Sequence, residues 1–178
     1  MTALTLSRPA RPRRPAADLS AGARTFLATG AAVVTLPILW ALARALTGFA
    51  PHAGALREVA LAIHLATVVP AIPLGAWVLM GRKGSARHRL LGKIWLALMV
   101  VAAVSAIWIR HLNDGGFSAI HLLVPVVLVA SWRAVASARA GNIAAHKRGL
   151  LLLFVGGLLV PAVTAFVPGR LMWMWLVG

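Results

Sequence analysis

The chain has 178 residues, of which 61% are apolar and 12% are charged. The charged share is about half that of a typical soluble domain, and a soluble fold of this length cannot bury so much apolar surface. The acidic side chains are limited to Asp18, Glu58 and Asp114, and cysteine is absent. These counts argue against paired-carboxylate catalysis and carboxylate-rich metal sites, and they exclude disulfides, iron–sulfur clusters and thiol catalysis.

The net charge of +15 does not indicate nucleic-acid binding, because the basic residues lie between long apolar blocks, as in membrane proteins. Segment 1–24 carries five arginines interleaved with three prolines, and it is predicted to be a disordered basic tail in the cytoplasm. The apolar block at about 25–46 is longer than the roughly 7 to 15 residues of a signal-peptide core. It is therefore predicted to be the first transmembrane helix.

Four further apolar blocks follow, at about 59–80, 90–109, 117–136 and 149–167. Each has about the 20 residues that a helix needs to cross the hydrocarbon of a bilayer. Helices are predicted because lipid cannot satisfy the open edge of a sheet. The expected fold is all-α: a polytopic membrane bundle of about five transmembrane helices, forming one domain over 25–178 in contact with the lipid bilayer.

The distribution of charge predicts the orientation of this bundle. Thirteen of the 18 basic residues lie in the tail and in two connections, around 81–93 and 139–148. The positive-inside rule therefore predicts a multi-pass protein of the bacterial inner membrane, with a cytoplasmic N-terminus and a periplasmic or extracellular C-terminus. Arg44 is expected to extend outward from the end of the first helix, and Trp173 and Trp175 are expected to anchor the C-terminal segment at the interface.

The second and third predicted helices resemble the fourth and fifth at an offset of 57 residues. His64 matches His121, and His88 matches His146 after a slip of one residue. The other matched pairs are Ile63 and Ile120, Leu65 and Leu122, Arg82 and Arg139, Gly84 and Gly141, Ser85 and Asn142, and Gly92 and Gly149. Both units run in the same direction, so the pattern predicts an internal repeat around a pseudo-two-fold axis along the membrane normal. Chance similarity between apolar helices is the alternative.

The repeated histidines form two predicted levels in the bundle. His64 and His121 share a depth in the outer part, whereas His88 and His146 open their helices at the cytoplasmic face. An ionisable residue in a span points to function, and neutral imidazole commonly binds haem iron inside helical bundles. The arrangement predicts that His64 and His121 bind the iron of an outer haem b, and that His88 and His146 bind an inner one, so that electrons could cross the membrane.

Basic residues beside the inner level could pair with the haem propionates. These residues are Arg82, Arg87, Arg89 and Lys147. The same histidines also have a structural interpretation, in which the outer pair hydrogen-bonds across a helix interface and the inner pair contacts lipid phosphates. His52 and His111 fall in outer loops, where a solvated role is expected. The glycines at 75, 156 and 157 predict close approach of helices.

Four segments of the chain resemble the motifs of a known family. They are RKGSARHRLLGKIW at 82–95, RHLNDGGFSAIHLL at 110–123, AAHKR at 144–148 and FVPGR at 166–170. The bacterial integral-membrane family that they resemble is catalogued as domain of unknown function 2306, and the resemblance covers about residues 58–172. It implies a multi-helix membrane protein and supplies no established activity.

The order of the histidines is similar, by analogy, to that of transmembrane di-haem b-type cytochromes of the ascorbate and ferric reductase kind. In those proteins four successive helices each supply one histidine, paired first with third and second with fourth. The sequence leaves three classes of function open: a haem-binding electron carrier, with a quinone or another redox partner; a small-molecule or lipid transporter or binding protein; and a non-catalytic membrane subunit. The sequence does not decide whether the chain is part of a membrane oxidoreductase. It also does not decide the oligomeric state.

Overall fold

The computed structural model describes residues 19–110 and 115–178. In these residues five helical segments are long and apolar enough to cross a membrane. They are α1 (Ala21–Leu46), α2 (Val59–Met80), α3 (Ala86–Ala106), the segment Ala119–Arg139, and the segment Ile143–Thr164. The predicted all-α membrane bundle is therefore confirmed. Most of the predicted basic tail, together with His111 and Asp114, lies outside the described residues.

Two of the five segments are not uniform α-helices. The first combines the 3-10 turn η2 (Ala119–Leu122) with α4 (Leu123–Arg139). The second combines α5 (Ile143–Phe154), the π-helical turn η3 (Val155–Leu159) and α6 (Val160–Thr164). The remaining elements are a 3-10 turn η1 (Ala53–Arg57) and a short helix α7 (Leu171–Val177).

Three helices, α1, α3 and α5, begin earlier than the apolar pattern predicted, and the last two show why. α3 begins at Ala86, where the Ser85 hydroxyl accepts a hydrogen bond from the His88 N–H at 3.1 Å. α5 begins at Ile143, where the Asn142 side chain accepts from the Ala145 N–H at 3.1 Å. The first turns of both helices are basic, so a prediction based on apolar residues missed them, whereas the capping oxygen satisfies free N–H groups whatever the polarity of the turn.

The turn before each of these helices requires a glycine. Gly84 has a φ of +76° and Gly141 a φ of +71°, a left-handed conformation that other residues adopt at a cost. The two positions are 57 residues apart, as are the capping residues Ser85 and Asn142. The two helical hairpins thus share local structure at matched positions. The internal repeat as a whole stays a prediction.

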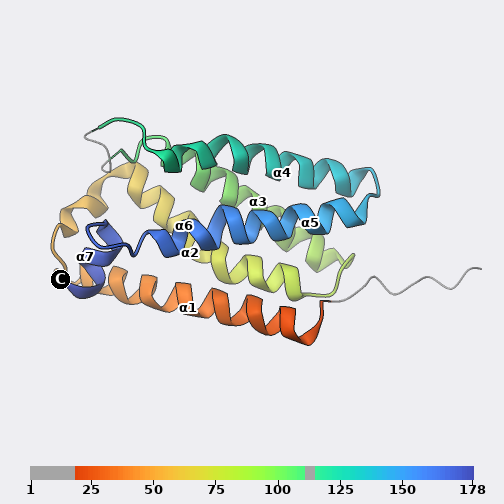
Figure 1. Ribbon diagram of the computed structural model, residues 1–178, viewed down its shortest axis with the longest axis horizontal. Helices are drawn as coiled ribbons and strands as arrows, with labels where there is room; N and C mark the ends of the chain where they lie inside the picture. Colours follow the sequence, from red (N-terminus) through yellow and green to blue (C-terminus); the bar gives the residue numbers. More distant parts are fainter. Residues whose placement is uncertain (1–18, 111–114) are drawn as a thin grey trace, which may run out of the picture.

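Figure 1 shows the bundle side on, with consecutive spans running in opposite directions. The start of α1, the α2–α3 turn and the α4–α5 turn lie at one end, which we call the basic end. The opposite end carries η1, η2 and α7, together with the C-terminus, and we call it the cavity end. The two connections that were predicted to share a membrane face therefore emerge on the same side.

The main core forms where α2, α3 and α5 meet at Gly75. A Cβ added at Gly75 would lie 2.5 Å from Trp95 Nε1 and 2.7 Å from Phe154 Cδ2. Both aromatic side chains are fully buried, and their ring centroids lie 6.3 Å apart. The predicted close approach at Gly75 is confirmed, because only a residue without a side chain leaves room for this aromatic pair.

A second core cluster joins α7 to the end of α1. Trp175 is completely buried there and packs with Ala41 and Ala45. The expectation that Trp175 anchors the chain at the membrane interface is therefore wrong, because its indole fills space beside the small residues of α1. Burial of an aromatic side chain of this size is among the largest apolar contributions to packing.

Arg44 also binds α7 to α1. Its Nη1 donates to the Leu176 carbonyl at 2.7 Å, and its Nη2 donates to the Phe49 carbonyl at 3.1 Å and to the Gly178 carbonyl. A cation is well suited to the carbonyls at the end of a helix, which have no partner within the helix.

We expect Arg44→Gln to release α7 and to lower the free energy of unfolding by about 1.5 to 3 kcal/mol, the usual value for hydrogen bonds to a charged group. The measurement is thermal unfolding in detergent, combined with limited proteolysis of the C-terminal segment. Arg57→Gln is the matched control, since no hydrogen bond of the Arg57 side chain is found within the described residues. Unchanged proteolysis in Arg44→Gln would contradict this role.

Candidate functional site

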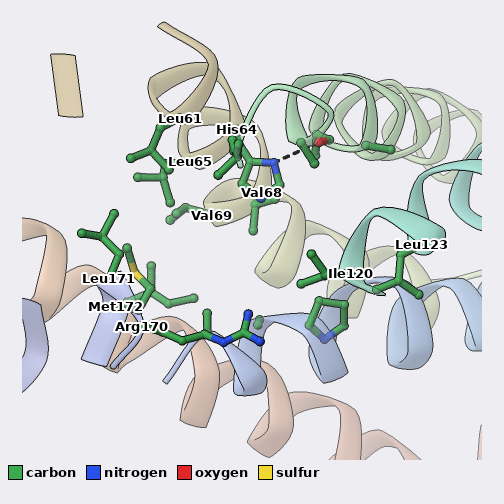
Figure 2. A pocket seen from close by; sticks show the side chains of 18 of the residues that line it. Leu61, His64, Leu65, Val68, Val69, Ile120, Leu123, Arg170, Leu171 and Met172 are labelled. Atoms are coloured by element: carbon green, nitrogen blue, oxygen red, sulfur yellow. Dashed lines mark hydrogen bonds between the residues drawn. The ribbon is translucent and has the colours of Figure 1, made fainter. Parts of the chain in front are cut away.

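A cavity of about 730 Å³ opens at the cavity end between the helices. Its wall is mainly apolar, and Figure 2 shows part of this wall, including Leu65, Val68 and Val69 on one side. The ionisable side chains that line it are His52, Glu58, His64, His121 and Arg170. An apolar cavity of a few hundred cubic ångströms with a few polar groups is the usual form of a small-molecule site.

A π-helical turn shapes one wall of the cavity. Gly157 and Leu158, both within η3, line the cavity, as does Pro161, whose missing N–H cannot continue the helical hydrogen bonds. A Cβ at Gly157 would lie 3.2 Å from the Val127 side chain, whereas one at Gly156 would meet nothing within 4 Å. Close approach is thus confirmed for Gly157 and is absent at Gly156. Single π turns of this kind are frequent at functional sites.

His64 comes from α2 and is held by α3. Its Nδ1 lies 2.9 Å from the Ala102 carbonyl and 3.4 Å from Ser105 Oγ, and Figure 2 marks the bond to the carbonyl. A carbonyl oxygen only accepts hydrogen bonds, so Nδ1 carries the proton and Nε2 keeps its lone pair. Metal-binding histidines are commonly oriented in this way, with the second nitrogen donating to a backbone carbonyl.

His121 comes from η2, the 3-10 turn that directly precedes α4. Its Nδ1 lies 3.0 Å from the Ser118 N–H and 3.1 Å from the Ser118 carbonyl, so either tautomer finds a partner on the same residue. The first arrangement is a capping box at the start of the turn. The second leaves Nε2 with its lone pair, as in His64. In the described structure Nε2 is buried and has no hydrogen-bond partner.

Two further side chains fix the His121 ring. Phe117 packs edge-on against it, with ring centroids 5.0 Å apart. The Arg110 guanidinium lies 4.3 Å from the centroid of the Phe117 ring, and its Nε donates to the Ile107 carbonyl at 3.2 Å. The imidazole is therefore positioned by a stack that begins at the end of α3.

His88 and His146 lie at the basic end, away from this cavity. His146 Nδ1 lies 2.8 Å from the Ala134 carbonyl of the preceding helix, and His88 Nδ1 is buried without a hydrogen-bond partner among the described residues. The two side chains are close enough to interact electrostatically. The space beside His88 is a separate pocket of about 190 Å³, whose lining does not include His146.

Arg170 is a cavity residue that the sequence-based site did not include. It precedes α7, and Figure 2 shows its guanidinium extending toward the middle of the pocket. Glu58 and His52 line the same cavity from the opposite connection, between α1 and α2. The FVPGR motif at 166–170 was the available signal, but nothing in the sequence indicated that this segment folds back over the bundle.

The helices and the cavity define a multi-pass membrane protein with a pocket inside its bundle. The chain belongs to the family described as predicted membrane protein (DUF2306), whose model matches residues 61–177. This match confirms the resemblance found in the sequence. No curated protein and no solved structure matches the chain significantly.

Proposed function

We propose that the chain is a b-type haem protein of the membrane, in which His64 and His121 bind the iron inside the cavity. The observation that carries the proposal is that two imidazoles from separate elements line one apolar cavity. Each ring also has Nδ1 within hydrogen-bond distance of a backbone carbonyl, at 2.9 Å for His64 and 3.1 Å for His121. That arrangement favours Nε2 as the ligand atom of His64. In His121 it does so when Nδ1 donates to the Ser118 carbonyl instead of accepting from the Ser118 N–H.

The residues of the cavity fit such a group. The buried Nε2 of His121 lacks a partner in the described structure, and a buried polar atom without a partner costs free energy that a ligand could recover. The wall is apolar, as the haem macrocycle requires. Cysteine is absent, so the axial ligands that the lining offers are imidazole and the methionine thioether. Bound haem would supply one-electron transfer, and the protein would orient it and exclude water.

The proposal concerns one haem. The pocket beside His88 is about 190 Å³ and is not shared with His146, so the inner pair adds no comparable cavity. A second haem bound by His88 and His146 stays a prediction. A quinone or a protein redox partner would be needed to supply or remove the electron.

The proposal includes an orientation in the bacterial inner membrane. The positive-inside rule favours the basic end in the cytoplasm, which leaves the cavity at the outer face. We expect a membrane-impermeant maleimide added to spheroplasts to label Val177→Cys and to leave Ala140→Cys unlabelled until the membrane is permeabilised. The natural chain has no cysteine, so background is low. The reverse pattern of labelling would contradict this orientation.

The test of function is an absorption spectrum of the protein purified in detergent from haem-replete cells. We expect a Soret band, a reduced α-band and about one haem per chain by extraction. A protein that stays colourless, and that does not take up added haem, would remove the haem proposal.

A second candidate is a binding protein for an amphipathic small molecule. The capping box favours it, because His121 Nδ1 then accepts from the Ser118 N–H and the histidine has a structural role. A colourless protein that binds an amphiphile in the same cavity would support this candidate.

A further inference from the structure

Arg170 is held by its backbone at the mouth of the cavity. Its N–H donates to the Val167 carbonyl at 3.1 Å, and its carbonyl accepts from the Met174 N–H at 3.0 Å. The side chain is partly buried and lines the cavity. From this backbone the guanidinium extends toward the pocket, as Figure 2 shows.

The Arg170 guanidinium makes no hydrogen bond or ion pair with any residue that the structure describes. Glu58 lines the same cavity from the connection between α1 and α2. A guanidinium beside an apolar wall is stabilised by an anion, and its planar fork matches a carboxylate through two parallel hydrogen bonds.

We propose that Arg170 anchors the acidic group of the molecule that fills the cavity, and that this molecule is an amphipathic carboxylate. The neighbouring Leu171 and Met172 belong to the apolar lining, so the charged group meets Arg170 while the apolar body extends toward Val68 and Val127. The proposal rests on the proposed function for its preferred ligand, haem b, whose propionates are such carboxylates. A fatty acid shares the same chemistry.

The test compares haem b with its dimethyl ester, which lacks the free carboxylates, by titration into the haem-free protein in detergent. We expect Arg170→Gln to weaken binding of haem b by about 10-fold or more and to leave binding of the ester unchanged. Arg170→Lys, which keeps the charge but not the fork, should lie in between and also controls for folding. Arg57→Gln, from η1 and outside the cavity lining, should bind both as the wild type does.

Equal haem affinity in Arg170→Gln and the wild type would overturn the anchor, as would an equal loss for the ester. If the wild type binds no haem, the proposed function fails and the anchor is judged separately with dodecanoic acid and its methyl ester. Arg170-dependent binding of the acid alone would support the anchor. Equal binding of the acid and its ester, or no binding of either, would overturn it.

Discussion

His64→Ala is expected to weaken haem binding by at least about 100-fold, since the loss of an outer-shell partner alone costs about 10- to 100-fold in metal affinity. The substitution removes the imidazole that α3 holds through the Ala102 carbonyl. His121→Ala is expected to have a similar effect. The measurement is a haem titration of each purified variant, followed at the Soret band.

The matched control is His52→Asn, because His52 lines the same cavity at its rim. Asparagine tolerates the left-handed backbone at this position, where φ is 54°. This variant should bind haem as the wild type does. Wild-type affinity in His64→Ala, or an equal loss in His52→Asn, would show that the cavity does not use His64 as a ligand.

Gly75→Leu is expected to prevent folding into the native bundle, and Gly75→Ala to lower the free energy of unfolding by about 1 to 3 kcal/mol, the usual cost of overpacking. Even a single Cβ would lie 2.5 Å from Trp95 Nε1 and 2.7 Å from Phe154 Cδ2. Both neighbours are fully buried, so neither ring can move without disturbing the core. The measurement is the thermal unfolding midpoint in detergent, with monodispersity on size exclusion.

Gly156→Ala provides the control for Gly75→Ala. A Cβ at Gly156 meets nothing within 4 Å, so only helix propensity changes, in favour of alanine. We expect an unchanged or slightly raised midpoint. If the two alanine variants unfold at the same temperature, the close packing around Gly75 does not determine stability.

The spans were predictable because each depends on one property, the length of an apolar block. α2 has the predicted bounds, Val59–Met80, and the basic connections emerge at one end as expected. The prediction failed where the polarity of a residue does not indicate its structure. The first turns of α3 and α5 are helical although they are basic, because Ser85 and Asn142 cap them. Trp175 is buried although it lies near the C-terminus, because α7 packs on α1.

The candidate site was predicted in part. The predicted repeat paired His64 with His121, and both residues line the same cavity. The contribution of Arg170 was not predictable, because it depends on the fold of the segment after α6 over the end of the bundle. The shape of the wall at Gly157 depends on a π-helical turn, and no pattern of apolar residues distinguishes that turn from a regular α-helix.

Electron paramagnetic resonance of the oxidised, haem-loaded protein tests most directly whether one iron binds two imidazoles. Ligation by both His64 and His121 predicts a low-spin ferric signal, which should convert to a high-spin signal in His121→Ala. A high-spin signal in the wild type, or a low-spin signal that survives both His64→Ala and His121→Ala, would contradict the account.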